Sequence, residues 1–183
     1  MQDLQVITTV LGVVFGAIGA GLGLWQYRRN QIWRETEFVA NETKAFFDSP
    51  NISSALKILD RDDRDVEVAP GKVIFVTRSM LRAALACGPD ATTFSDNEAA
   101  VRDIFDDFLV GLERFEQFIK AGVIEFYQLQ PYLRFWAGLL TGKRPQILDK
   151  NTLRCIWDFM DDYEYTDAIA LLEHYHPRPN FDG

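Results

Sequence analysis

The sequence predicts an all-α protein in which an N-terminal transmembrane helix continues into a stalk, followed by an irregular helical bundle with at most one small hairpin or ordered loop. Two observations predict this fold class. One is an uncharged, largely apolar segment near the N-terminus, and the other is the recurrence of apolar residues every three or four positions through most of the remaining chain. We divide the 183 residues into a transmembrane helix at 1–27, a juxtamembrane helical stalk at 28–49 and a cytoplasmic helical domain at 50–183.

The uncharged segment is long enough to cross a bilayer. It covers the 24 residues from Leu4 to Tyr27, which as a helix would reach roughly 36 Å, against a hydrocarbon core of about 30 Å. A cleavable signal peptide has a basic start and a shorter apolar core, whereas this segment follows Asp3 and is longer. We therefore expect the segment to remain in the mature protein.

The flanks of the segment predict its orientation. Arg28, Arg29 and Arg34 follow it and no Lys or Arg precedes it, so the positive-inside rule places the C-terminal domain in the cytoplasm and the N-terminus outside the cell membrane. Trp25 and Tyr27 join these arginines as predicted membrane-interface anchors, because amphipathic rings settle near lipid headgroups. The lipid bilayer is thus the first expected partner of this single-pass chain.

Small residues along the predicted span define a possible helix-association face. Residues at a spacing of four let two helix backbones approach closely. The residues are Gly12, Gly16, Ala20, Gly19 and Gly23. They favour a homo-oligomer or a membrane-protein partner, but glycine is also common in membrane helices that do not associate. Both interpretations stay open.

The first part of the chain after the span predicts two helices and a hairpin. The absence of Gly and Pro extends the stalk helix to about Phe47, and Pro50 can open a second helix that reaches Leu59. Two β-branched runs surround a Pro-Gly turn at 70–71, which predicts either a small hairpin or an ordered loop. A short helix is expected at 79–87.

The clearest helix signal begins at Ser95. Ser95 and Glu98 have the spacing of a capping box, and Gly122 suits the position that follows a helix C-terminus. Between them, apolar positions alternate in steps of four and three, which predicts the central core seam. The seam residues are Val101, Phe105, Phe108, Leu112, Phe115 and Ile119.

Three more helices are expected towards the C-terminus. Pro131 is predicted in the first turn of a helix that ends at Gly142, Asn151 is predicted to cap the next helix, and Thr166 the last. Most aromatic side chains belong to the apolar faces of these helices. Phe126, Tyr127 and Tyr163 do not belong to these faces. They are expected at the surface, where they could form a groove for a partner.

Charge and composition exclude several function classes. With 19 Lys and Arg against 27 Asp and Glu, the net charge of -8 would repel phosphate backbones, so no nucleic acid partner is expected. Cys87 and Cys155 form no C-x-x-C pair and are interpreted as small buried hydrophobes in a reducing compartment. His174 and His176 are interpreted as surface residues of a loose terminus. No cofactor or metal is predicted.

Carboxylates offer the only candidate chemistry. A D-x-x-D-D pattern occurs at 103–107 and again at 158–162, and such side chains could hold Mg²⁺ near a phosphate. Helical geometry turns most of them to solvent and leaves Asp106 and Asp161 beside the apolar faces. Asp60, from a separate charged run at 60–67, is the third candidate acidic position. A membrane-anchored enzyme or effector that uses clustered carboxylates, with or without a metal, is therefore the alternative to a non-catalytic interaction or assembly module. A small subunit of a larger membrane complex is a third hypothesis.

Several segments after the span carry a family resemblance. They are Ala55–Asp60, Val101–Phe108, Leu112–Glu116 and Gly122–Ile124. With them, the chain resembles uncharacterised bacterial single-pass membrane proteins that have a C-terminal cytoplasmic helical domain. That family has no known function, so the resemblance implies the topology and no catalytic residue. If Asp60 and the Arg102–Asp106 pair are signature positions, the resemblance implies a buried ion pair that holds helices together.

Overall fold

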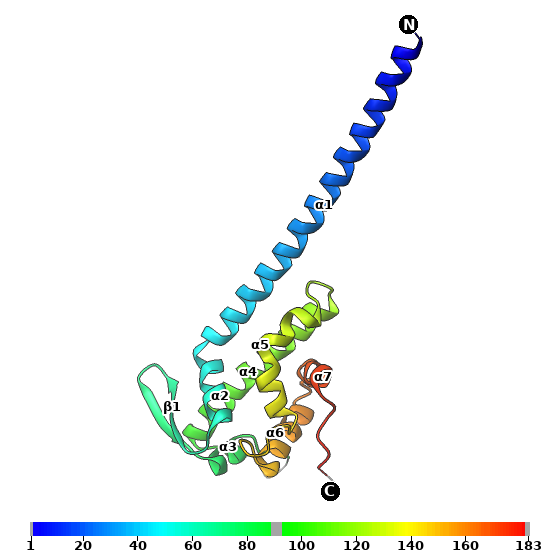
Figure 1. Ribbon diagram of the computed structural model, residues 1–183. Helices are drawn as coiled ribbons and strands as arrows, with labels where there is room; N and C mark the ends of the chain where they lie inside the picture. Colours follow the sequence, from blue (N-terminus) through cyan, green and yellow to red (C-terminus); the bar gives the residue numbers. More distant parts are fainter. Residues whose placement is uncertain (1, 89–92, 182–183) are drawn as a thin grey trace. The chain divides into compact units, whose positions relative to one another are not determined.

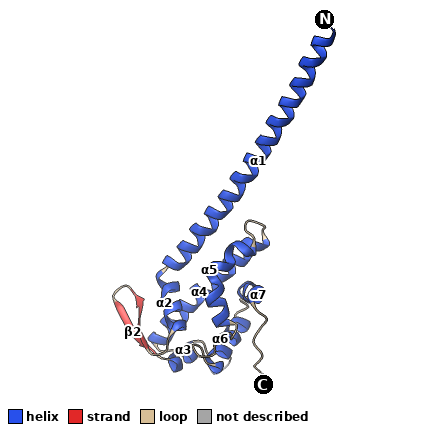
Figure 2. Cartoon of the chain, in the orientation of Figure 1, coloured by secondary structure: helices blue, strands red, loops and turns tan. Residues whose placement is uncertain are grey.

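The computed structural model describes residues 2–88 and 93–181, and the side chains of residues 2–18 and 20 lie outside the description. In this part of the chain there are seven α-helices and one two-stranded sheet (Figures 1 and 2). The predicted helical bundle is therefore confirmed. The chain divides into two compact units, Met1–Ala40 and Asn41–Gly183.

The first unit consists of the long N-terminal helix. Helix α1 runs from Gln2 to Asp48 without a break, so the last turns of this helix belong to the second unit. Among the described residues, no helix combines the length and the hydropathy that a membrane crossing requires. Most of the predicted span from Leu4 to Tyr27 lies outside the residues whose side chains are described.

The second unit is the bundle with its hairpin. Its elements are α2 (Pro50–Asp60), β1 (Arg64–Ala69), β2 (Lys72–Val76), α3 (Arg78–Ala84), α4 (Asp96–Lys120), α5 (Phe126–Leu140), α6 (Lys150–Asp162) and α7 (Thr166–Tyr175). Helices α2, α3 and α7 all pack against α4, and α5 packs against α7. Helix α4 is thus the centre of the bundle.

Local sequence explains why α4 forms and which face it buries. The Ser95 hydroxyl accepts a hydrogen bond from the Glu98 amide at 3.3 Å, and the Glu98 carboxylate accepts one from the Ser95 amide at 2.8 Å. This confirms the predicted capping box. The predicted seam is also confirmed, because its residues from Val101 to Phe115 are buried, while Ile119 is half-buried.

Strands β1 and β2 form an antiparallel hairpin, so the hairpin and not an ordered loop is correct. Gly71 holds φ +75°, a left-handed turn conformation that glycine adopts without strain. The register places Val66 opposite Ile74, and both side chains are buried. The pairing shifts between Glu67 and Ala69, which is a β-bulge.

Three helix starts differ from those predicted. Asp149 caps α6 in place of Asn151, because its carboxylate accepts the amides of both Asn151 and Thr152 at 3.0 Å. Helix α5 begins earlier than expected, at Phe126, because Glu125 forms a capping box with Gln128, and Pro131 therefore lies inside the helix. Thr166 is the first residue of α7 and not its cap.

Candidate membrane-interface segment

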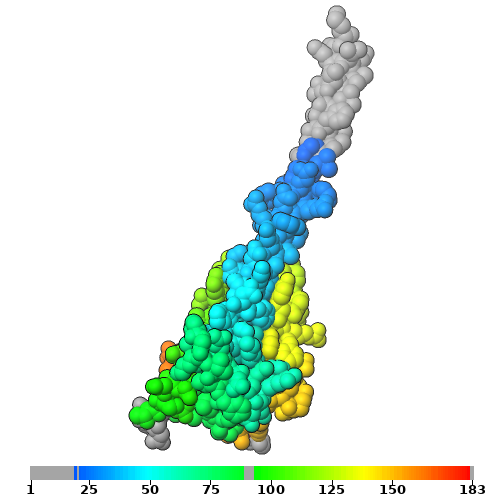
Figure 3. Space-filling model, turned by 90° about the vertical axis from the view of Figure 1, so that its left-hand side faces the viewer, coloured from blue at the N-terminus to red at the C-terminus, as the bar shows by residue number. Residues whose placement is uncertain are grey.

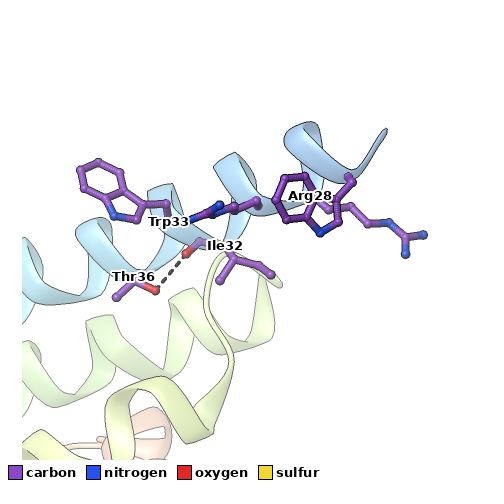
Figure 4. Close-up of a pocket in the computed structure, with 6 residues that line it drawn as sticks. Arg28, Ile32, Trp33 and Thr36 are labelled. Carbon is purple, nitrogen blue, oxygen red and sulfur yellow. Dashed lines mark hydrogen bonds between the residues drawn. The ribbon is translucent and has the colours of Figure 1, made fainter. Parts of the chain in front are cut away.

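One stripe of α1 combines exposed aromatic and basic side chains. We call it the Trp25–Thr36 stripe, and it consists of Trp25, Arg28, Arg29, Ile32, Trp33 and Thr36. Its members recur three and four residues apart, so they share one face of the helix. Together they line a shallow hollow of about 390 Å³ (Figure 4).

Interactions within the stripe are local. The Arg29 guanidinium lies 5.4 Å from the centroid of the Trp25 ring, within the range of a cation–π interaction. The Thr36 hydroxyl donates to the Ile32 carbonyl oxygen at 2.9 Å (Figure 4), so the stripe presents mainly rings, an aliphatic side chain and guanidinium groups. Trp25 and Trp33 are 57% and 66% exposed. This chemistry is typical of helix segments at a membrane–water boundary.

All five predicted membrane-interface anchors are exposed on α1. Trp25, Arg28 and Arg29 belong to the stripe. Tyr27 and Arg34 lie on the opposite side, because about 100° per residue places them roughly 200° and 180° from Trp25. Aromatic and basic side chains therefore surround the helix at this level. Ile32 and Thr36 also belong to the stripe, but they were not predicted from the sequence as interface residues. Their helical spacing from Trp25 could have identified them.

The predicted helix-association face is only partly described. Gly12, Gly16 and Ala20 lie outside the residues with described surroundings, so the prediction for them stays open. Gly19 and Gly23 are exposed, and a Cβ atom added to either would meet no other atom of the described residues within 4 Å. The space beside these two residues is thus free for another helix.

The structure gives the three candidate acidic residues different surroundings. Asp106 accepts a hydrogen bond from the Tyr165 hydroxyl at 2.8 Å, and burial together with this bond raises the pKa of Tyr165 above its usual value. Asp161 binds the guanidinium of Arg178. Asp60 is the last residue of α2, with one carboxylate oxygen 3.8 Å from Arg61 Nε. The three carboxylates are therefore not joined by a shared partner.

Other titratable groups also fail to assemble a metal centre: among the side chains that the structure describes, no group of three or more His, Cys, Asp or Glu is arranged to hold an ion. His174 is exposed as expected, but it belongs to α7 and not to a loose terminus, and its Nε2 lies 3.1 Å from the buried Glu116 carboxylate. Phe126, expected at the surface, is half-buried and stacks on the His174 ring at 5.0 Å. These residues tie α4, α5 and α7 together. Tyr127 and Tyr163 are exposed as expected.

Arg78 is the most connected buried cation in the described part of the chain, and sequence reasoning missed it. Its guanidinium donates to the carbonyl oxygens of Ile58 at 2.8 Å, Leu59 at 3.2 Å and Ile147 at 3.1 Å, and it binds the Asp62 carboxylate. The first two carbonyls belong to the last turn of α2, where helical partners are lacking. Arg78 therefore joins α2, α3 and the loop before α6.

Arg102 also differs from its predicted role. It does not form an ion pair with Asp106; it donates to the Ala84 carbonyl oxygen at 2.8 Å. Its guanidinium lies 4.6–4.7 Å from the ring centroids of three aromatic residues, Phe94, Phe159 and Tyr163. The interpretation of Arg102 and Asp106 as one ion pair is therefore wrong, because aromatic rings and a carbonyl group replace the carboxylate as partners of the arginine.

No family model, curated protein or solved structure matches the chain. The resemblance to uncharacterised single-pass membrane proteins accordingly stays a prediction.

Proposed function

We propose that the chain is a single-pass, membrane-anchored interaction or assembly module, whose helical domain is cytoplasmic and performs no catalysis of its own. The observation that carries the proposal is the direct succession of an uncharged 24-residue segment, Leu4 to Tyr27, and the exposed Trp25–Thr36 stripe. An apolar helix long enough to span, followed by rings and arginines at one end, is the pattern of a membrane anchor with its cytoplasmic boundary.

The absence of catalysis is proposed because the candidate carboxylates serve separate contacts. An enzyme built on Asp60, Asp106 and Asp161 needs these groups to converge on one substrate. Asp106 instead accepts from Tyr165, and Asp161 binds Arg178. The first interaction joins α4 to the residue before α7, and the second joins α6 to the segment after α7, so both have a structural role within the bundle.

Carbonate extraction of membranes tests the anchor. The full chain should stay in the membrane pellet at alkaline pH, where peripheral proteins are released. Replacing Val13 and Val14 together by Arg should move the chain to the supernatant, because each central arginine costs about 2.5–3.5 kcal/mol of insertion free energy. The matched control replaces the same two residues by Leu and should stay in the pellet. Release of the unaltered chain by carbonate would refute the anchor.

Protease protection tests the orientation. In spheroplasts treated with protease, a tag after Gly183 should be protected from cleavage. In inverted membrane vesicles the same tag should be cleaved. Cleavage from the outside would show that the helical domain is not cytoplasmic.

Association through the predicted glycine face has its own test. Gly19→Leu and Gly23→Leu should lower the cross-linked dimer fraction several-fold in membranes, because a bulky side chain keeps the helix backbones apart. Gly21→Leu is the matched control, since Gly21 lies about 200° from Gly19 around the helix and a Cβ there also meets no atom in the described part of the chain within 4 Å. Equal effects of all three variants would contradict association through this face and leave the anchor untouched.

A further inference from the structure

The hairpin has one buried and one open face. Val66, Ile74 and Val76 are buried against the bundle, whereas Val73 and Phe75 are 59% and 55% exposed. In the register of the sheet, Val73 lies opposite Glu67 and Phe75 lies opposite Asp65. Because alternate residues share a face, the open face pairs each large apolar side chain with an exposed carboxylate.

The two edges of the hairpin also differ. Helix α2 packs along β1, where the Ser54 hydroxyl donates to the Glu67 carbonyl oxygen at 2.8 Å, and the bulge after Glu67 further disrupts that edge. In the described part of the chain, no hydrogen bond from outside the hairpin reaches the backbone of Val73–Val76. Figures 1 and 2 show the hairpin projecting from one side of the helices, and Figure 3 views the molecule from that side.

An open edge of this kind is normally protected. Proteins shield edge strands with charged residues, proline, bulges or a covering element, because alternate N–H and C=O groups would otherwise pair with another chain. On β2, Lys72 stands only at the first position, and the four residues that follow are Val, Ile, Phe and Val. The strand therefore offers both hydrogen-bonding groups and apolar side chains to an extended segment.

Charge identifies the kind of segment. A third strand beside β2 would place alternate side chains next to Val73 and Phe75, with Asp65 and Glu67 behind them. Lys or Arg at those positions can lie over the Phe75 ring and extend towards the carboxylates. A second copy of this chain would instead bring like charges together, since the net charge is -8.

We propose that the outer edge of β2 is a docking site for an extended, positively charged segment of a partner protein, which adds to the hairpin as a third strand. The inference rests on the proposed interaction role and does not depend on the anchor. It names the chemistry of the partner: alternating basic and apolar residues in an extended conformation.

The test uses the full chain in bilayer discs of neutral lipid and a short synthetic peptide of alternating Lys and Val. Binding of the labelled peptide should be saturable, should weaken with salt, and should slow amide hydrogen exchange in Val73–Val76 at least about tenfold, since the open amides become paired. The same peptide methylated on every backbone nitrogen cannot donate hydrogen bonds and should lose at least about tenfold in affinity, or 1.4 kcal/mol.

Two variants of the protein separate docking from general charge attraction. Phe75→Ser should weaken peptide binding at least about tenfold, whereas Tyr132→Ser, which removes another exposed aromatic ring, on α5, should not. Asp65→Asn should reduce both the affinity and its salt dependence; Glu67 is left unchanged because its carboxylate accepts the Gly71 amide of the hairpin turn at 2.9 Å.

Three results would overturn the proposal. They are equal binding of the methylated peptide, unchanged binding by Phe75→Ser, and protection of β2 amides that rises with protein concentration in the absence of peptide. The last result would assign the edge to a second copy. Carbonate extraction distinguishes these failures from a failure of the anchor, because loss of peptide binding in a chain that stays in the membrane pellet refutes the docking site alone.

Discussion

At the scale of single residues, Arg78 is expected to contribute more to stability than any other buried cation among the described residues. Arg78→Lys should lower the free energy of unfolding by about 2–4 kcal/mol, because an ammonium group cannot reach three carbonyl oxygens and a carboxylate at once, and buried acceptors then lose their partners. Urea unfolding followed by circular dichroism measures the change.

Arg61→Lys is the control for this substitution. Arg61 is exposed and its ion pair with Asp60 spans 3.8 Å, so the change should stay within about 0.5 kcal/mol. Equal effects of the two substitutions would contradict the role assigned to Arg78.

Gly111 provides a second test at this scale. A Cβ atom on Gly111 would lie 2.6 Å from Phe46 Cε2 and 3.3 Å from Ile52 Cδ1. Gly111→Ala should therefore destabilise the protein by about 1–3 kcal/mol, although alanine is about 1 kcal/mol better than glycine in a helix interior. Thermal unfolding measures the loss.

Relief of that clash should be visible in a double-mutant cycle. In a Phe46→Leu background, Gly111→Ala should cost less than in the unaltered protein, because the smaller side chain leaves room for the added methyl group. Strict additivity would show that the close approach of Phe46 is not the cause.

At the scale of elements, the start of α6 should make stability depend on acidic pH. Burial raises the pKa of Asp149, but hydrogen bonds from Thr152 and Asn151 and the nearby Arg82 outweigh it, so the pKa is lowered overall. A lowered folded pKa contributes stability above the unfolded value of about 3.9, and this contribution is lost as pH falls through the folded pKa.

Asp149→Ala should accordingly cost about 1 kcal/mol near neutral pH, the usual value for an N-cap, and progressively less below about pH 4. Asn151→Ala, at the position the sequence favoured as the cap, should be close to neutral at every pH. Urea unfolding across this pH range compares the two variants. A larger effect at Asn151 would mean that the cap is assigned to the wrong residue.

The same helix starts show what could and could not be predicted from the sequence. The capping box at Ser95 was predictable because, of the polar residues at this helix start, only Ser95 has a glutamate three residues later. At α6, Asp149 and Asn151 compete, and the outcome depends on the hydroxyl of Thr152, which donates to Asp149 at 2.6 Å. Arg78 was not predictable, because its acceptors lie 16 or more residues away along the chain.

For the candidate site, local spacing was sufficient. The membrane-interface role of the residues from Trp25 to Arg34 stays a prediction from composition and from their position after an apolar segment, whereas the exposed stripe follows from helical periodicity. The open edge of β2 could not be predicted from the sequence, because the alternation of apolar and polar residues does not show which edge of a hairpin a helix covers.

At the scale of the whole molecule, the unit Asn41–Gly183 should fold without the residues before it. A chain that begins at Asn41 keeps Phe46, whose ring centroid lies 5.2 Å from that of Phe115 and 6.1 Å from that of Phe108. A chain that begins at Pro50 loses this ring and should be about 3–5 kcal/mol less stable, in the range of Phe→Ala substitutions in cores.

Thermal unfolding of both shortened chains measures the difference. Phe46→Ala in the longer chain is the control and should reproduce most of the loss. Equal stability of the two shortened chains would contradict a structural role for the last turn of α1.

The bonds of Arg78 also bear on the order of folding events. The Ile147 carbonyl oxygen is 69 residues away along the chain, so that bond can form only after a long loop has closed, and such late contacts are weak in the folding transition state. Loss of the guanidinium should then accelerate unfolding while leaving the refolding rate nearly unchanged. Stopped-flow measurements should thus show that Arg78 slows unfolding of the bundle without accelerating its folding.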